Sequence, residues 1–175
     1  MKLFKTIFVT SALTLGFFAV TTSLQSCSKK DKCDIVCYNG GECVDGVCEC
    51  PVGFEGKDCK TYTRSKYKGM FIALDNCVTT ERNNASLNYT IFILNGPVEE
   101  PTKVIVRGLG NQDGGNVELT GHVNGSTLTL DTQTVGGKEY SGKIEYINQT
   151  DLKATFTIKE GNEIVESCFS AMARS

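Results

Sequence analysis

The sequence predicts an all-β protein: a small disulfide-rich module, followed by an antiparallel meander of about eight strands that closes as a barrel or packs as a sandwich. Three observations lead to this prediction. Six of the nine cysteines lie within residues 33–59, short runs of alternating apolar and polar residues recur from residue 66 onward, and no run of ten or more residues has a convincing helical period. Alternation with a period of two is typical of half-buried strands.

The N-terminus has the features of an export signal. Lys2 and Lys5 precede residues 7–20, a stretch of mainly apolar and small residues without charge. This stretch is short for a membrane-spanning helix, which needs roughly 20 apolar residues. A basic start, a short apolar core and small polar residues are typical of a secretory signal peptide. We therefore expect residues 1–26 to be removed on export, with a retained membrane anchor as the alternative.

Leu24-Gln25-Ser26-Cys27 resembles the lipobox of bacterial lipoproteins. The resemblance implies that Cys27 carries a diacylglycerol thioether and becomes the first mature residue, with residues 27–32 as a lipidated tether to the outer membrane. Several acyl chains together anchor a protein stably, whereas one chain holds it only weakly. The cysteine count agrees, because six cysteines belong to the module, two more can pair, and one is left over. The alternative is cleavage near Ser23 that leaves a free thiol.

The cysteine-rich module, residues 33–59, has the spacing C-x3-C-x5-C-x4-C-x-C-x8-C. A segment this short cannot bury enough apolar surface to offset its chain entropy, so it needs cross-links. Export favours disulfides, and a zinc site is the alternative that the close pair Cys48 and Cys50 leaves open. Asp45-Gly46, between two valines, predicts a tight hairpin.

This spacing, with Asn39-Gly40-Gly41 before the third cysteine and Gly53-Phe54-Glu55-Gly56 before the sixth, resembles an EGF-like module. The resemblance implies a spacer or protein-binding surface without chemistry of its own. Calcium-binding members of the family carry acidic residues just before the first cysteine. This chain has Lys30-Asp31-Lys32 there, so we expect no calcium. The disulfides that the resemblance implies are Cys33–Cys43, Cys37–Cys48 and Cys50–Cys59.

Residues 60–65 are a short polar stretch that we expect to be a linker, and residues 66–175 are expected to form the all-β domain. Gly, Asn and Asp separate the alternating runs, and Asn124-Gly125 is a strong hairpin signal. The predicted strands are residues 66–74, 88–94, 103–107, 117–123, 127–130, 140–147, 151–159 and 163–172, with 77–82 as a further short candidate.

Cys77 follows the first of these strands and Cys168 lies in the last. If the sheet closes, the first and last strands become neighbours, and the two cysteines can form a disulfide. Such a bond would close a loop of about 90 residues and contribute on the order of 4–5 kcal/mol in the chain-entropy model. Two buried free thiols are the alternative. The strand number, the paired cysteines and the position after an EGF-like module resemble the lipocalin-like β domains of bacterial surface lipoproteins.

No residue pattern indicates catalysis, a cofactor or a nucleic-acid surface. The net charge is −2, and it becomes −4 when loss of residues 1–26 leaves 16 basic against 20 acidic residues. The single histidine, His122, falls on the polar face of its strand, where a solvated side chain is expected. Gly108-Leu109-Gly110 and Asp113-Gly114-Gly115 open no predicted helix, so we expect loops rather than phosphate-binding turns.

We therefore expect a non-enzymatic binding protein of the cell envelope. In one hypothesis the barrel carries a small apolar ligand, because an eight-stranded barrel is just wide enough to hold one. In the other, a protein or glycan partner binds the loops and the EGF-like module, and the β domain has a filled core. The candidate interior residues, which would fill that core in the second hypothesis, are Phe71, Ile91, Val104, Leu128, Phe156 and Phe169.

Overall fold

The computed structural model describes residues 33–79 and 83–175, except for the side chains of residues 79–87 and 112–113. It contains the cysteine-rich module and a closed, eight-stranded antiparallel barrel, which confirms the predicted all-β class and decides for a barrel over a sandwich. The expected signal peptide, Cys27 and the tether lie outside the described residues. Within the described part, no helix combines the length and the apolar character that a membrane span requires.

The module is built on two small two-stranded sheets. β1 (Glu42–Val44) pairs with β2 (Val47–Glu49), and β3 (Phe54–Glu55) pairs with β4 (Thr61–Tyr62). Asp45 and Gly46 connect β1 to β2 with φ values of 49° and 83°. Two central residues with positive φ are the signature of a type I′ turn, whose twist matches that of the flanking strands.

Four disulfides cross-link the described residues, three in the module and one in the barrel. Their pairs are Cys33–Cys43, Cys37–Cys48, Cys50–Cys59 and Cys77–Cys168, the same pairs that the sequence leads us to expect. The module buries few apolar side chains, and Val36, Val47 and Val52 are exposed. The cross-links therefore take over the role that an apolar core has in a larger domain.

The segment that we expect to be a linker, residues 60–65, is ordered secondary structure. It holds β4 and the start of η1 (Thr63–Lys66), a short 3-10 helix. Arg64 of η1 is buried, and its Nη1 donates to the carbonyl oxygens of Pro97, Glu100 and Lys103 at 2.9, 2.7 and 3.0 Å. These bonds fasten η1 to the loop between the second and third barrel strands, because the loop carbonyls have a charged donor as their partner.

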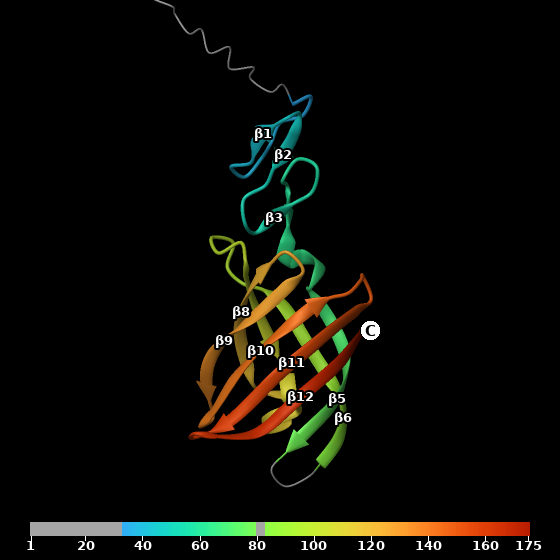
Figure 1. Ribbon diagram of the computed structural model, residues 1–175, viewed down its shortest axis with the longest axis vertical. Coiled ribbons are helices and arrows are strands. Elements are labelled where there is room, and N and C mark those ends of the chain that lie inside the picture. The colour runs from blue at the N-terminus through green and yellow to red at the C-terminus, as the bar shows by residue number, and fades with distance from the viewer. Residues whose placement is uncertain (1–32, 80–82) are drawn as a thin grey trace, which may run out of the picture. The chain divides into compact units, whose positions relative to one another are not determined.

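The barrel strands follow one another around the cylinder, and the last strand closes against the first (Figure 1). Eight strands were expected and eight are present. They are β5 (Gly69–Thr79), β6 (Asn83–Asn95), β7 (Lys103–Arg107), β8 (Glu118–Asn124), β9 (Thr127–Val135), β10 (Lys138–Tyr146), β11 (Asp151–Glu160) and β12 (Glu163–Arg174). The hairpin expected at Asn124-Gly125 joins β8 to β9.

The first barrel strand differs from its predicted bounds. The sequence predicts a strand that ends at residue 74 and a separate short one from residue 77, whereas β5 continues without interruption to Thr79. Cys77 therefore lies within the strand, directly opposite Cys168 of β12. The reason is that β12 supplies backbone partners along this whole length, which a local sequence pattern does not reveal.

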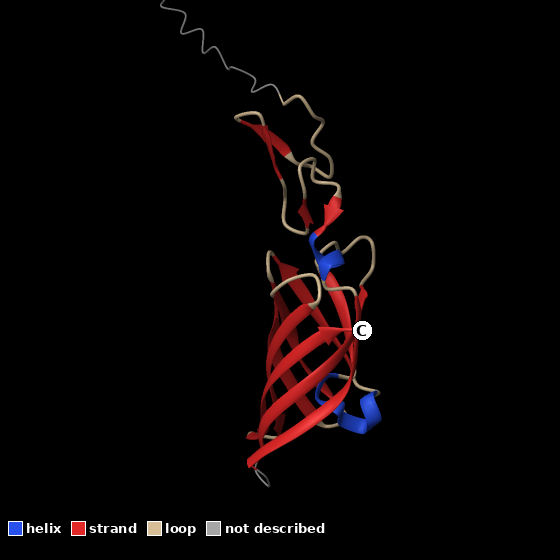
Figure 2. Cartoon of the chain, turned by 90° about the vertical axis from the view of Figure 1, so that its right-hand side faces the viewer, coloured by secondary structure: helices blue, strands red, loops and turns tan. Residues whose placement is uncertain are grey.

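The glycine-rich segment after β7 is a 3-10 helix, η2 (Leu109–Gly115), and not the loop that the sequence predicts. Gly108 caps its N-terminus in the left-handed conformation, with φ of 87°. A side chain would strain this conformation, so glycine permits the tight turn from strand to helix. Figure 2 shows η1 and η2 at opposite ends of the barrel.

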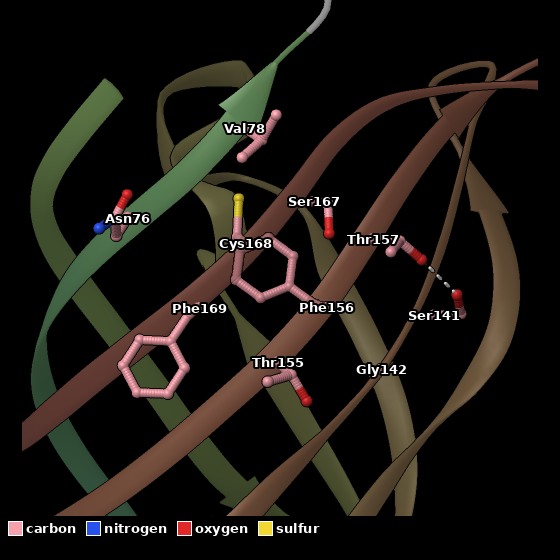
Figure 3. Close-up of a pocket in the computed structure, with 10 residues that line it drawn as sticks. All are labelled: Asn76, Val78, Ser141, Gly142, Thr155, Phe156, Thr157, Ser167, Cys168 and Phe169. Atoms are coloured by element: carbon pink, nitrogen blue, oxygen red, sulfur yellow. Dashed lines mark hydrogen bonds between the residues drawn. The ribbon is translucent and has the colours of Figure 1, made fainter. Parts of the chain in front are cut away.

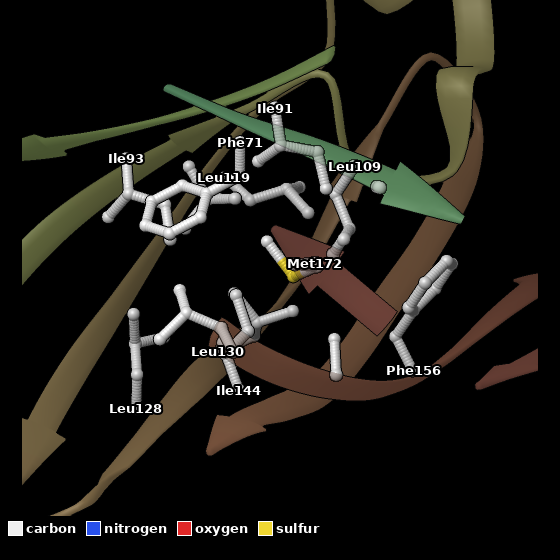
Figure 4. Close-up of a cluster of buried hydrophobic side chains, with 14 of the residues drawn as sticks. Phe71, Ile91, Ile93, Leu109, Leu119, Leu128, Leu130, Ile144, Phe156 and Met172 are labelled. Atoms are coloured by element: carbon white, nitrogen blue, oxygen red, sulfur yellow. The ribbon is translucent and has the colours of Figure 1, made fainter. Parts of the chain in front are cut away.

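The barrel interior is a continuous apolar core to which every strand contributes (Figure 4). Five of the six candidate interior residues are buried in it: Phe71, Ile91, Val104, Leu128 and Phe156. The prediction for Phe169 is wrong, because this side chain points outward and is 44% exposed. Alternation along β12 places Cys168 and Ser170 inside, so the residue between them must face out. Leu109 of η2 also enters the core.

We expect the double substitution Cys77→Ala and Cys168→Ala to lower the free energy of unfolding by about 4–5 kcal/mol. The disulfide joins residues 91 positions apart, so its loss frees a long loop in the unfolded chain. Urea denaturation followed by circular dichroism measures the change. A loss below about 1 kcal/mol would show that strand pairing closes the barrel without help from the cross-link.

We expect Arg64→Met to destabilise the protein by roughly 2–4 kcal/mol, because three loop carbonyls lose a charged donor while the apolar stem keeps its packing. The matched control is Arg107→Met. Arg107 is an exposed arginine paired with Glu118 at 2.6 Å, and its loss should cost about 1 kcal/mol or less. Equal effects of the two substitutions in urea denaturation would contradict the proposed fastening of the loop.

Candidate ligand site inside the barrel

A small group of polar side chains interrupts the apolar core. Asp75 of β5 and Ser170 of β12 lie opposite each other in the antiparallel register, and both point inward. Their side chains are almost fully enclosed, with 1% of Asp75 and none of Ser170 exposed. Tyr89 of β6 reaches them from the other neighbouring strand and is also buried. We call Asp75, Tyr89 and Ser170 the polar cluster.

The tyrosine hydroxyl of the polar cluster is satisfied on both sides. It donates to Oδ2 of Asp75 at 2.5 Å and accepts from the backbone N–H of Gly110 at 2.8 Å. Gly110 belongs to η2, so this chain of hydrogen bonds connects the strand wall to the helix at that end of the barrel. Bonds of this kind in a dry interior are strong, because water does not compete for them.

The other two polar atoms of the cluster have no such partners. Oδ1 of Asp75 and Oγ of Ser170 are buried without a hydrogen bond of ideal geometry, although the Ser170 hydroxyl lies close enough to the carboxyl to act on it as a hydrogen-bond donor. Enclosing an unsatisfied polar group costs about 1–3 kcal/mol. Native proteins keep such groups in small numbers, and each one needs an explanation such as strain, a functional role or a bound water or ion.

The surroundings alter the acidity of the polar cluster. Burial raises the pKa of the Asp75 carboxyl above its ordinary value of 3.8, and the nearby hydroxyls of Ser170 and Tyr89 oppose this rise only in part. Burial also raises the pKa of Tyr89, and the Asp75 carboxylate raises it further. The phenol therefore stays protonated and remains the donor to Asp75.

The barrel disulfide lies directly beside the carboxyl group. A carboxylate oxygen of Asp75 and the sulfur atoms of Cys77 and Cys168 are all within 4.8 Å of one another. Cys33, Cys37 and Cys48 of the module form a similar group. In both groups the sulfurs are joined in disulfides, so they are not the thiolates that bind zinc. The zinc alternative for the module therefore has no support from this geometry.

A hollow of about 430 Å³ lies on the outer surface of β5, β10, β11 and β12 (Figure 3). Phe169 and Val78 give it an apolar side, and Ser141 and Thr157 bond to each other at 2.9 Å on the opposite side. It continues into an apolar surface, because the outward residues of β5 include exposed Ile72 and Leu74. None of the outward side chains in residues 70–78 of β5 and residues 167–173 of β12 is charged.

His122 is where the sequence places it, on the outer face of β8. Its ring Nδ1 is 3.0 Å from the hydroxyl of Thr102, and its Nε2 is 3.7 Å from Asp131. The imidazole is half-exposed and far from the polar cluster in the strand order. Sequence reasoning missed Asp75 and Ser170 altogether. The available signal was that Asp75 alternates with Phe71 and Cys77 and so lies on the same face of the strand. The signal is weak because β5 carries apolar residues on both faces.

The comparisons with known proteins leave the family open. No family model matches the chain, and no curated protein matches it. Among solved structures, the chain is similar to an S-type phycobiliprotein lyase, CPES, from Guillardia theta, at 9% sequence identity and a TM-score of 0.43. The match covers 64% of this chain and 90% of that one. A similarity of this degree supports no statement about activity or ligand.

We expect the parent protein to lose stability relative to the Asp75→Asn variant as pH rises above about 4. Because the folded pKa of Asp75 is raised above 3.8, there is a pH window in which the folded state keeps a proton that the unfolded chain has released. Stability falls with rising pH in such a window, and asparagine, which does not titrate, lacks this fall. Urea denaturation between pH 4 and pH 7 measures both proteins. A constant difference between them would contradict the raised pKa.

Proposed function

We propose that this protein is an exported, non-enzymatic lipoprotein that is held at the outer membrane through Cys27 and binds a small, largely apolar ligand inside its barrel. The lipobox-like Leu24-Gln25-Ser26-Cys27 supports the anchor, and the four disulfides agree with an oxidising compartment. The cysteine-rich module is an EGF-like spacer between the tether and a lipocalin-like barrel.

One observation carries the ligand-binding proposal: the polar side chains of Asp75 and Ser170 face each other inside a largely apolar barrel, and Oδ1 and Oγ there lack a hydrogen bond of ideal geometry. Small-molecule sites combine apolar walls with a few convergent polar groups that orient the ligand. A purely structural core would be more stable with apolar residues at both positions, because no polar group would then be left unpaired. A ligand that forms hydrogen bonds with these two side chains would explain why both positions are polar.

The end of the barrel that η2 covers is the proposed entrance. Leu109 of η2 enters the core, and the Gly110 N–H bond to Tyr89 holds the same helix to β6. Displacing η2 would break this bond and uncover the polar cluster. At the other end, η1 is fastened by the three bonds of Arg64, which makes that end the less suitable entrance.

A second candidate function is protein binding on the outer surface of the barrel. It is favoured by the uncharged face of β5 and β12, where Leu74, Val78 and Phe169 are exposed. Exposed apolar patches of this kind often mark interaction sites. In this alternative the barrel core is filled and the protein acts in adhesion or as a scaffold.

Native mass spectrometry of the oxidised protein from residue 28 onward, purified from a bacterial periplasm, tests the proposal. This chain contains the whole compact unit of residues 31–175. We expect an added mass that is lost on denaturation, and lower occupancy in the Ser170→Ala variant, because the substitution removes a polar contact. Asp131→Asn, which changes a partly exposed acid on β9, is the control and should keep the occupancy.

A bare mass in the parent protein, eight hydrogens below the fully reduced value, would show four disulfides and nothing bound. That result would contradict the carrier function in this preparation and favour the adhesion or scaffolding alternative.

A further inference from the structure

We propose that the barrel forms a symmetric dimer, in which the outer face of β5 and β12 of one copy packs on the same face of a second copy. This inference goes beyond the proposed function, because it does not depend on a ligand inside the barrel. It assigns to a second copy of this chain the surface that the adhesion alternative would offer to another protein.

Exposed apolar side chains are concentrated on three strands that lie side by side in the barrel, β12, β5 and β6. Six large ones, which we call the apolar strip, point outward there: Met70, Ile72, Leu74, Val78, Phe92 and Phe169. Met70 and Phe92 are direct cross-strand neighbours, so the strip continues from β5 to β6. The six residues are 40–57% exposed, and together they present on the order of 500 Å² of apolar surface. A monomer ordinarily leaves a patch of this size exposed only where it has a function.

The outward residues of β5 and β12 differ in size in a way that makes the face complementary to itself. In the antiparallel register, each outward residue of β5 lies opposite one of β12, and each such pair joins a large apolar side chain to a smaller one. The pairs are Ile72 with Ala173, Leu74 with Ala171, Asn76 with Phe169, and Val78 with Ser167.

A two-fold axis between two facing copies, parallel to β5 and above the line between β5 and β12, exchanges these two strands. It places each large side chain opposite the smaller member of the same pair in the partner copy, as a self-complementary interface requires. Leu74 lies near the middle of the strip, and the methyl group of Ala171 leaves room above β12 for a leucine of the partner copy. The hollow beside Phe169 and Val78 gives one end of the face additional depth (Figure 3).

The distribution of charge also favours a second copy as the occupant. The chain from residue 28 onward has 16 basic and 20 acidic residues, so two copies repel each other weakly. The uncharged outward face of β5 and β12 lets them approach without bringing like charges together. Beside the strip, β11 carries Asp151 and Lys153, which have opposite charges. A surface that lies on a membrane typically has an excess of basic residues around its apolar part, which this face does not have in the part of β11 next to it.

The geometry of the barrel sets the kind of association and its strength. The barrel strands close into a cylinder, so two copies cannot join edge to edge and have to pack face to face. A standard interface buries roughly 800 Å² on each partner, which is more than the apolar strip provides. We therefore expect a weak, reversible dimer with a dissociation constant on the order of 10 µM.

Sedimentation velocity of the oxidised protein from residue 28 onward, at about 1 to about 200 µM, tests the proposal. This chain lacks Cys27, so a disulfide through that thiol cannot produce a dimer. We expect monomers at the low concentration and mainly dimers at the high one. Leu74→Lys should raise the dissociation constant at least tenfold, because it places a charge in the middle of the interface. The matched control is Thr129→Lys, which adds the same charge to an exposed position of β9, four strands from β5, and should change it less than about threefold.

Ala171→Leu tests the two-fold pairing itself. The substitution makes the face more apolar but fills the space that the partner's Leu74 needs, so we expect it to weaken the dimer about tenfold or more. Unspecific apolar association would become stronger instead. Both altered positions are exposed, so circular dichroism should show an unchanged fold for each variant.

Three results would overturn the inference. The first is a parent protein that stays monomeric at the highest concentration, including one that instead co-sediments with vesicles of phosphatidylethanolamine and phosphatidylglycerol. The second is a dimer that Leu74→Lys leaves intact, and the third is a dimer that Ala171→Leu strengthens or leaves unchanged. None of these results bears on the proposed ligand inside the barrel, which native mass spectrometry tests separately.

Discussion

The pairing of β5 with β12 is the constraint on which the rest of the barrel depends. These strands are first and last in the barrel, and their contact turns an open meander into a closed cylinder. Cys77 and Cys168 lie opposite each other across this pair and are joined by a disulfide inside the barrel. Side chains alternate between the two faces of a strand. The inward position of one cysteine therefore determines which of the neighbouring residues in its strand point inward and which point outward.

This fixed alternation of inward and outward side chains has two consequences for β5 and β12. It aligns Asp75 with Ser170 inside the barrel, where burial raises the pKa of the carboxyl and leaves polar atoms without hydrogen bonds of ideal geometry. It also forces Phe169 and Leu74 into solvent. Apolar residues at 75 and 170 and polar ones at 74 and 169 would make a more stable isolated protein. The actual arrangement agrees with an interior and an outer face that each serve in binding.

Much of the fold could be predicted because its signals are local. Spacing and turn residues such as Asp45-Gly46 and Asn124-Gly125 act over a few positions, and the strand alternation in residues 151–159 reads directly from the sequence. The site could not be predicted in the same way. Residues 70–74 are apolar on both faces, so β5 shows no period of two, and only its pairing with β12 reveals that Asp75 is inside. The glycine-rich η2 likewise depends on the core that receives Leu109.

The most direct test of the account is a carbon-13 NMR titration of the Asp75 carboxyl, assigned by its disappearance in Asp75→Asn. The account predicts a midpoint above the ordinary value of 3.8, caused by burial. A carboxyl that titrates near 3.8 would contradict the enclosed acid on which the candidate site depends.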